Sequence, residues 1–298
     1  MEIQPLVDLV HAGDHKALAR CISLVENDSE STSQILQSLH FKNVPVIGIT
    51  GPPGAGKSTL VNGIITKLLE ANKKIGIIAV DPSSPFNFGA LLGDRVRMSN
   101  HFNNENVFIR SLATRGSLGG LSDKVIEVVD VMRAANFDFI FVETVGVGQS
   151  EVEIAGLADT TVVVLVPESG DEVQTMKAGL LEIADIFVVN KGDRDGADTF
   201  MKNLKSLVSG RMRNEWTVPV LKTVATNAEG IDELIEKIAE HTQHHHNTER
   251  KIFLLTEKAM KMMVKKQMKK IDREKLQMQI QSAVEKGELN FYKVVAGF

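Results

Sequence analysis

A run of eight residues has the types and spacing of a phosphate-binding loop. Residues 51–58 read Gly-Pro-Pro-Gly-Ala-Gly-Lys-Ser and stand between an apolar run and a helix-like run. Glycines let successive backbone N–H groups point at phosphate oxygens, and the helix that follows adds partial positive charge where an anion sits. The sequence therefore predicts a nucleotide site, with Lys57 at the β- and γ-phosphates and Ser58 on Mg²⁺. The positions assigned to this loop are Gly51, Pro52, Pro53, Gly54, Ala55, Gly56, Lys57, Ser58 and Thr59.

A second motif selects the base of the nucleotide. Asn190, Lys191 and Asp193 form Asn-Lys-x-Asp directly after an apolar run. The carboxylate of Asp193 can accept hydrogen bonds from the N1–H and the N2 amino group of guanine, whereas adenine would leave that carboxylate desolvated and unpaired. The pattern predicts GTP and GDP as ligands, and we assign Ala225 to the same site.

Three acidic residues are placed by the sequence to hold Mg²⁺ together with Ser58. Asp81 ends an apolar run, Asp94 lies in Leu-Gly-Asp-Arg, and Glu143 ends another apolar run. Mg²⁺ prefers hard oxygen ligands, which carboxylates supply. For Asp94 an ordinary surface acid is a nearly equal interpretation. Glu143 is followed closely by Gly146, an arrangement that resembles a switch whose glycine N–H contacts the γ-phosphate.

Hydrophobic periodicity predicts the elements that must position these residues. Apolar runs that suit buried strands are 44–49, 75–80, 107–109, 137–142, 161–166, 185–189 and 218–221. Helical stretches lie between them, around 59–70, 122–135, 149–157, 171–182, 197–209 and 230–241. This alternation is typical of an α/β fold with a mostly parallel sheet flanked by helices. Right-handed crossovers then bring the C-terminal ends of all strands to one edge, where the ligand is expected.

The two ends of the chain differ from this central part. Both have helical apolar spacing, so we predict an N-terminal helical extension (1–41), a nucleotide-binding domain (42–243) and a C-terminal helical arm (244–298). The arm holds 12 Lys+Arg and 6 Asp+Glu, a local charge of +6. A basic amphipathic helix can bind a membrane or nucleic acid. We favour packing of its apolar stripe on the core or on a second subunit.

The composition is that of an ordinary globular protein. The 298 residues are 43% hydrophobic and 24% charged, and the net charge of −4 disfavours nucleic acid as a partner. The one cysteine, Cys21, excludes an internal disulfide framework. No apolar stretch approaches the ~20 residues that span a bilayer, and the first residues resemble neither a signal peptide nor a transit peptide. We expect a cytoplasmic protein with no membrane or nucleic-acid partner.

Together these motifs closely resemble those of the GTPases that act as chaperones of methylmalonyl-CoA mutase, the MeaB/ArgK type of the SIMIBI class of P-loop GTPases. The resemblance covers roughly residues 40–240. It rests on GPPGAGKST (51–59), DPSSPF (81–86), LLGDRVRM (91–98), ATRGSLGGLS (113–122), VETVGVGQSEVE (142–153), GDEVQTMKAG (170–179) and NKGD (190–193). Two loops depart from the family pattern, because Glu168-Ser169 replaces the usual Gly-Ala and Asn87-Phe88 replaces the usual Thr-Gly.

The resemblance implies a slow GTPase that a partner switches on. Such a protein would gate the loading of adenosylcobalamin into an acyl-CoA mutase of the methylmalonyl-CoA type and protect that mutase against inactivation. It would form a homodimer to which the helical ends contribute. Residues 168–177 fall on a mobile loop through which the family couples nucleotide state to the mutase. The positions that carry over in that loop are Asp171, Gln174 and Lys177.

Hydrolysis in such a site needs positioning, Mg²⁺ and charge stabilisation, with water as the nucleophile. We assign catalytic roles to Lys57, Glu143 and Gln149, the last as a residue that positions the water. The sequence contains no evident general base. The candidate charge stabilisers are Arg95, Arg97, Arg110 and Arg115.

Two other activities stay open from the sequence, as does a non-enzymatic role as a nucleotide-stabilised scaffold whose hydrolysis is incidental. Members of this family have been labelled arginine/ornithine transport kinases, although the sequence offers no recognisable pocket for a phosphate acceptor. A group of histidines raises a nickel-insertion role, for which a polar loop between helices is the simpler interpretation. These histidines are His241, His244, His245 and His246.

Overall fold

The computed structural model describes most of the chain as two compact units, Met1–His245 and His246–Phe298. In the first unit the described residues are 3–81, 98–113, 124–145, 150–169, 178–209, 212–213 and 216–244. In the second unit they are 252, 256, 259–260, 262–264, 266–268 and 270–296.

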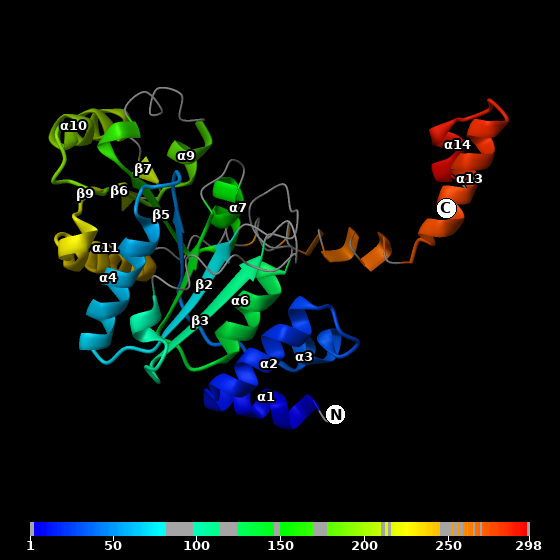
Figure 1. Ribbon diagram of the computed structural model, residues 1–298, viewed down its shortest axis with the longest axis horizontal. Coiled ribbons are helices and arrows are strands. Elements are labelled where there is room, and N and C mark those ends of the chain that lie inside the picture. Colours follow the sequence, from blue (N-terminus) through cyan, green and yellow to red (C-terminus); the bar gives the residue numbers. More distant parts are fainter. Residues whose placement is uncertain are drawn as a thin grey trace. The chain divides into compact units, whose positions relative to one another are not determined.

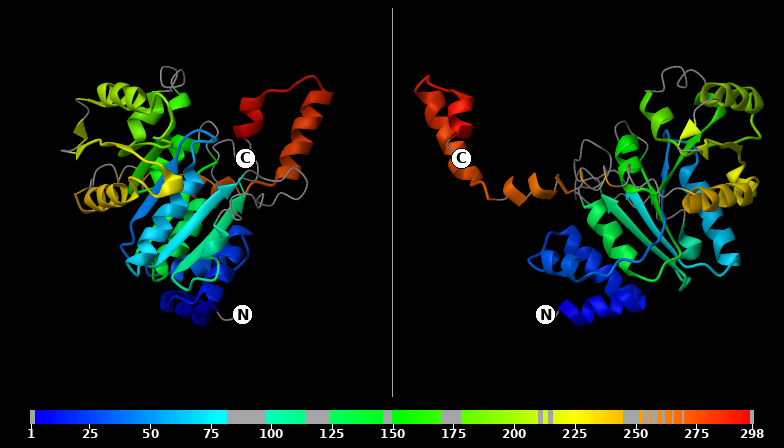
Figure 2. Two further views of the ribbon diagram at one scale, coloured as in Figure 1. Left: turned by 60° about the vertical axis from the view of Figure 1, so that its left-hand side comes forward. Right: turned by 180° about the vertical axis from the view of Figure 1, so that it is seen from behind.

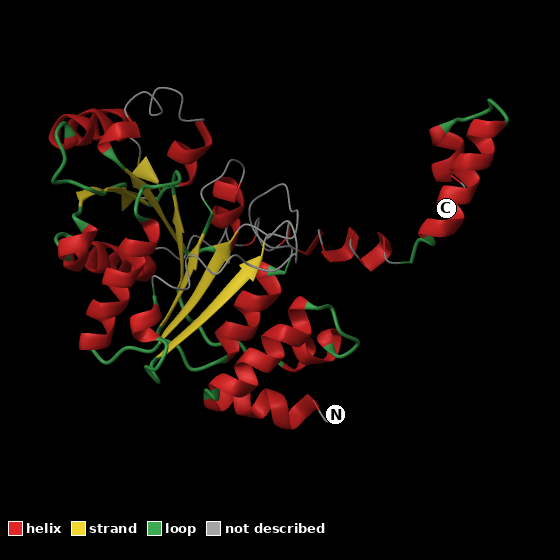
Figure 3. Cartoon of the chain, viewed as in Figure 1, coloured by secondary structure: helices red, strands yellow, loops and turns green. Residues whose placement is uncertain are grey.

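The first unit is built on a seven-stranded sheet with the order β3-β2-β4-β1-β5-β6-β9. All neighbouring strands in this sheet are parallel, and Figure 3 shows them in yellow between layers of helices. The strands are β1 (Val46–Thr50), β2 (Ile75–Asp81), β3 (Val107–Ala113), β4 (Phe139–Glu143), β5 (Thr160–Leu165), β6 (Ile186–Val189) and β9 (Val220–Lys222). Because the strands are parallel, their C-terminal ends share one edge of the sheet.

Helices cover both faces of this sheet (Figures 1 and 2). On one face α4 (Lys57–Glu70) and α11 (Ile231–His244) pack on strand residues such as Ile47 and Ile49. The other face carries the other α-helices described in this unit, in two apolar clusters. These helices are α1 (Ile3–Ala12), α2 (His15–Glu26), α3 (Thr32–Ser38), α6 (Val125–Ala134), α7 (Ser150–Leu157), α9 (Ala178–Ile183) and α10 (Ala197–Val208).

The side chains of each strand alternate between the two helical layers. In β5, Val162 and Val164 belong to the cluster with α4 and α11, whereas Val163 and Leu165 belong to the cluster with α9 and α10. Successive strand residues point to opposite faces, so a strand buried on both sides requires a continuous apolar run. That requirement explains why the Val/Ile runs in the sequence identify the strands.

The three N-terminal helices share a core with the sheet domain. Leu18 and Ile22 of α2 are fully buried in the same cluster as Val128 and Met132 of α6. The α2 helix begins after Asp14, whose carboxylate accepts a hydrogen bond from the N–H of Ala17 at 2.7 Å. Such a cap satisfies one of the free N–H groups in the first helical turn.

The structure confirms the predicted fold class and differs from the predicted strands mainly at their ends. β1 begins at Val46, after Pro45, which has no N–H to donate to a neighbouring strand. β3 continues to Ala113 although Arg110 and Ser111 are polar, because it is an edge strand and these side chains are only partly covered. One antiparallel pair, β7 (Met212–Arg213) with β8 (Trp216–Thr217), was not predicted and has only two residues in each strand.

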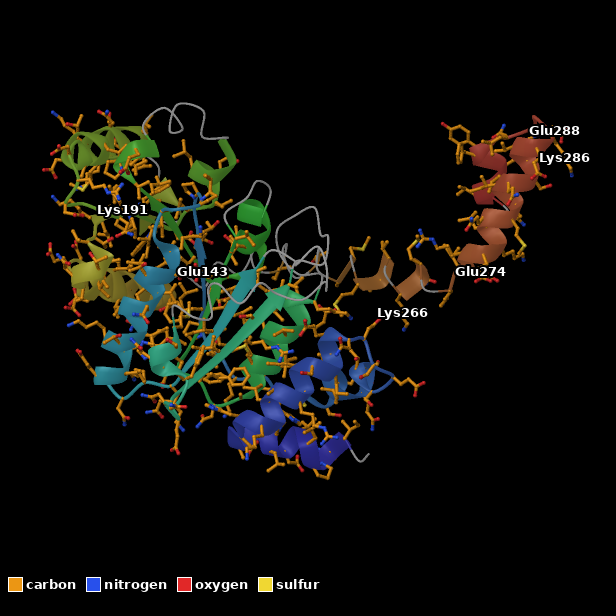
Figure 4. The ribbon with its side chains drawn as sticks, viewed as in Figure 1. Glu143, Lys191, Lys266, Glu274, Lys286 and Glu288 are labelled. Atoms are coloured by element: carbon orange, nitrogen blue, oxygen red, sulfur yellow. The ribbon has the colours of Figure 1, made fainter. Side chains whose placement is uncertain are left out.

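The second unit contains α13 (Arg273–Glu285) and α14 (Phe291–Ala296). Asp272 caps α13 by accepting a hydrogen bond from the N–H of Lys275 at 3.0 Å. Neither helix buries a residue, and charged side chains such as Glu274 and Lys286 extend from this unit (Figure 4). Within the described residues of both units, no helix has the length and apolar character needed to cross a membrane.

Candidate nucleotide site

The phosphate loop leaves the sheet at the end of its central strand. β1 ends at Thr50, and α4 begins at Lys57. Gly51 has φ +140°, and a Cβ on it would lie 2.0 Å from the carbonyl oxygen of Val164. An alanine at position 51 would therefore clash with backbone of β5 and be strained in its own backbone. The sharp turn that directs the loop toward the helix depends on this glycine.

Lys57 and Ser58 stand at the N-terminal end of α4 with their side chains buried. The ammonium of Lys57 donates to the carbonyl oxygens of Gly51 at 2.9 Å and Pro52 at 3.1 Å. Only 7% of Lys57 is exposed. A buried cation at a helix N-terminus, where the dipole is also positive, creates a strong local preference for an anion.

Glu143 meets the phosphate loop from the neighbouring strand. The hydroxyl of Ser58 donates to Oε1 of Glu143 at 2.6 Å, and these residues are 4% and 3% exposed. A hydroxyl and a carboxylate buried side by side are hard oxygen donors, the chemistry that Mg²⁺ requires. The donor set fits the predicted ion, which when bound would neutralise charge on phosphate oxygens.

The other two predicted metal ligands are less closely placed. Asp81 closes β2, two residues beyond Ala79, which is the register partner of Glu143. Its backbone therefore lies near the same edge of the sheet. Asp94 is outside the described residues.

Asn190 joins the guanine motif to the phosphate loop. Its Nδ2 donates to the carbonyl oxygen of Ala55 at 2.9 Å, and its Oδ1 accepts from Thr223 Oγ1 at 3.0 Å and from the Ala225 N–H at 3.2 Å. Asn190 is 2% exposed. Gly56, with φ +87°, makes room for this contact, because a Cβ there would lie 2.4 Å from Asn190 Nδ2. One amide thus connects three loops at the edge of the sheet.

The loops after β6 and β9 are held together by their backbones. The N–H of Gly192 donates to the carbonyl oxygen of Thr223 at 2.9 Å, and Lys191 has a left-handed backbone with φ +55°. Asp193 is exposed beyond this contact, which the predicted reading of the base by its carboxylate requires. Figure 4 labels Lys191 and Glu143 in the first unit, where they come from different strand ends.

An ion pair connects the guanine motif to the start of the predicted partner-coupling loop. Arg194 follows the motif directly and donates to the carboxylate of Glu168, which lies in a short 3₁₀ turn (Pro167–Ser169) after β5. This hydrogen bond is the main cause that lowers the pKa of Glu168 below its ordinary value. Both side chains are about half exposed, so the contact is a surface one of modest strength.

Several predicted residues lie outside the described residues, and their placement stays a prediction. They are Asp94, Gly146, Gln149, Asp171, Gln174, Lys177, Arg95, Arg97 and Arg115. Arg110 is described, and it forms an ion pair with Glu26 of α2 at 2.6 Å and donates to Ser23. Because its guanidinium is committed to the N-terminal helices, we withdraw Arg110 as a charge stabiliser.

Sequence reasoning missed three polar residues at this edge of the sheet. Thr223 supports Asn190, and Thr144 donates its hydroxyl to Thr50 at 3.0 Å. Thr50 directly follows the predicted strand 44–49, Thr223 lies two residues after the predicted strand 218–221, and Thr144 follows the strand-ending Glu143. That position was the available signal for all three.

His241 does not lie in a polar loop as the sequence suggested. It is 4% exposed within α11, its Nδ1 is 2.8 Å from Thr160 Oγ1, and its ring contacts Trp216 edge-on. Among the described residues there is no group of three or more His, Cys, Asp or Glu side chains that could hold a metal ion. A buried histidine in a packed helix is poorly suited to accept nickel from solution.

Comparison with known proteins agrees with this geometry. The family described as methylmalonyl Co-A mutase-associated GTPase MeaB matches residues 18–285. A protein of Pyrococcus abyssi, provisionally named a GTPase, is 52% identical over 247 residues, which cover 81% of this chain and 76% of the relative. The fused isobutyryl-CoA mutase of Cupriavidus metallidurans is 38% identical over 244 residues, which cover 77% of this chain and 22% of that protein.

A solved structure extends the similarity to nearly the whole chain. The crystal structure of LAO/AO transport system kinase has a TM-score of 0.71 and 26% sequence identity, and the match covers 99% of this chain and 95% of that one. The chain belongs to the methylmalonyl-CoA mutase-associated GTPase family MeaB and is a P-loop GTPase.

Proposed function

We propose that this protein is a GTP-hydrolysing chaperone that gates the loading of adenosylcobalamin into an acyl-CoA mutase of the methylmalonyl-CoA type and protects that mutase. The observation that carries the proposal is the fused isobutyryl-CoA mutase, in which a segment similar to 77% of this chain belongs to the same polypeptide as a mutase. Fusion keeps two modules at a high effective concentration, which is useful when one acts on the other. The family description also names a mutase.

The proposed chemistry is transfer of the γ-phosphoryl group of GTP to water. Lys57 would bind the β- and γ-phosphates, and Ser58, Asp81, Asp94 and Glu143 would hold Mg²⁺. Gln149 would position the water, and the Gly146 N–H would contact the γ-phosphate. The buried Ser58–Glu143 contact supports this assignment, because a hydroxyl and a carboxylate, both donors that suit Mg²⁺, lie beside the phosphate loop. Catalysis in such a site is mainly positioning and charge stabilisation.

The guanine base would be read by Asp193, with Asn190 and Ala225 shaping the pocket. The link from Asn190 to Ala55 supports a site in which base recognition and phosphate recognition are coupled. Asp171, Gln174 and Lys177 would transmit the nucleotide state to the mutase. The Glu168–Arg194 pair supports that route, since it ties the start of this loop to the guanine motif.

A homodimer through the C-terminal unit is part of the proposal. Phe291, Tyr292 and Val295 of α14 are 60%, 89% and 69% exposed, and Met278 of α13 is 63% exposed. Helices in water are stabilised mainly by burying an apolar face. A second copy of the chain would provide that burial. Light scattering during gel filtration should give the mass of a dimer, and Phe291→Glu should shift the mass toward that of a monomer.

The function is tested by presenting the purified protein with adenosylcobalamin-dependent mutases that act on methylmalonyl-CoA and on isobutyryl-CoA. The protein should capture one of them when loaded with a non-hydrolysable GTP analogue, and that mutase should accelerate phosphate release from GTP. Lys57→Ala should abolish phosphate release, and Lys177→Ala should lower the mutase-stimulated rate more than the basal rate. If neither mutase is captured nor changes the rate, the proposed function is wrong.

A second candidate function is transfer of the phosphoryl group to an amino acid, suggested by the name of the solved LAO/AO transport system kinase. Incubation with γ-labelled GTP and arginine or ornithine distinguishes the two. The proposed function predicts label in free phosphate, whereas label on the amino acid would favour the kinase.

A further inference from the structure

Two buried threonine hydroxyls connect the phosphate loop to the strand end that carries Glu143. Thr50 is the last residue of β1, and Thr144 follows the last residue of the neighbouring β4. Thr144 Oγ1 donates to Thr50 Oγ1 at 3.0 Å. Thr50 is 0% exposed and Thr144 is 2% exposed. The N–H of Thr144 also donates to the carbonyl oxygen of Ile49 at 3.0 Å, which extends the strand pairing past Glu143.

The Thr50–Thr144 pair lies directly beside two parts of the candidate nucleotide site. Gly51, the first residue of the phosphate loop, follows Thr50 directly. Glu143, which accepts a hydrogen bond from Ser58, precedes Thr144 directly. The segment 50–58 and the segment 143–144 are therefore joined at two points, one between hydroxyls and one between a hydroxyl and a carboxylate. A shift of one segment relative to the other must break both contacts or carry both segments together.

Breaking the hydroxyl contact is costly because it is buried. A buried donor or acceptor that loses its partner cannot turn to water, so it costs its desolvation free energy. The phosphate loop and the end of β4 are consequently held in one relative position while the threonines remain paired. This matters for catalysis because phosphoryl transfer depends on placing charges within fractions of an ångström.

We propose that Thr50 and Thr144 are positioning residues for GTP hydrolysis, which hold the carboxylate of Glu143 in register with the phosphate loop. The inference rests on the proposed GTP hydrolysis at this site. It adds a role for two residues that are not among the predicted metal or nucleotide ligands. The alternative is that the pair only stabilises the sheet.

A pair of substitutions separates these alternatives. Thr144→Val or Thr50→Val alone leaves one buried hydroxyl without its partner and should lower stability. The double variant Thr50→Val/Thr144→Val replaces the pair by two apolar side chains of the same shape, which should restore most of that stability. If the pair positions Glu143, the double variant should still hydrolyse GTP roughly two- to tenfold more slowly, the range that one net hydrogen bond corresponds to.

Thr161→Val provides a matched control. Thr161 is a threonine of β5 that is 1% exposed, and its Oγ1 has no hydrogen-bond partner among the described residues. Its register partner is Gly48, two residues before Thr50 along β1. The same substitution at this position should leave the hydrolysis rate within about twofold of the wild-type rate, because no hydrogen bond is lost.

Three quantities are measured for each variant: the free energy of unfolding in urea, kcat for phosphate release at saturating GTP, and the ratio of the Kd values for GDP and for a non-hydrolysable GTP analogue. Restored stability with a lowered kcat and a changed Kd ratio in the double variant supports the inference. A double variant with wild-type kcat and Kd ratio overturns it. A wild-type protein that releases no phosphate would instead refute the proposed function, while the Kd ratio still tests the threonine pair.

Discussion

Replacing Asn190 by alanine should loosen the contact between the phosphate loop and the loops that follow β6 and β9. The substitution removes the hydrogen bonds to Ala55, Thr223 and Ala225. Each contributes about 1 kcal/mol net, so the free energy of unfolding should fall by about 3 kcal/mol. Water should not replace the lost hydrogen bonds, because Asn190 is 2% exposed.

The nucleotide should also stabilise the variant less than the wild type. At a GDP concentration of about 100 Kd the wild-type protein should gain about 2.7 kcal/mol of unfolding free energy. If the loosened loop binds GDP tenfold more weakly, the same concentration adds only about 1.4 kcal/mol. Urea unfolding with and without GDP measures both quantities in one experiment.

Two other variants make this result specific. Thr223→Val removes only one of the three hydrogen bonds and should cost about 1 kcal/mol. Asn203→Ala, at an exposed position of α10, should change stability by less than about 0.5 kcal/mol. The reasoning is refuted if Asn190→Ala costs under about 1 kcal/mol, or if GDP stabilises it as strongly as the wild type.

Three further predictions follow from buried or paired side chains outside the nucleotide site. Burial lowers the pKa of His101 below 6.5, so the unfolded chain binds a proton more readily than the folded chain. The free energy of unfolding should therefore fall as the pH drops through about 6.5. In urea unfolding, His101→Phe should show a weaker dependence of this free energy on pH. Burial raises the pKa of the Cys21 thiol to about 11, so a thiol reagent at pH 8 should modify the native protein far more slowly than the urea-unfolded protein, and equal rates would contradict this. The Arg110–Glu26 pair, at 2.6 Å and with side chains 26% and 11% exposed, should give a coupling free energy of about 1 kcal/mol in a double-mutant cycle with alanine, and a value near zero would show that the pair adds no stability.

The elements of the fold were predictable because their signals are local in sequence. A strand buried on both faces needs a continuous apolar run, and the helices between such runs need apolar residues on one face only. The strand ends were less predictable, because the last hydrogen-bonded residues of a strand depend on which strand lies beside it. β1 begins only after Pro45, and β3 continues beyond Arg110 because it pairs with β2 along its length.

The candidate site divides in the same way. The phosphate loop could be identified because its glycines, lysine and serine are adjacent in the chain and are required by backbone geometry and charge. The residues that contact this loop, such as Glu143 and Asn190, could be inferred only from their positions at strand ends. Their assignment as ligands of Mg²⁺ and of guanine stays a prediction.

By itself, the sequence determined the approximate positions of the seven strands of the main sheet, of the helices between them and of the phosphate loop, because each depends on residues that are near one another in the chain. Only the tertiary structure decided which side chains meet. The strand order β4-β1-β5-β6 brings Glu143 to Ser58 and Thr144 to Thr50, and it brings Asn190 to Ala55 across 135 positions of sequence. Parallel strands end at a common edge, but their order across the sheet results from how the helices pack on its two faces, and no local pattern encodes that order.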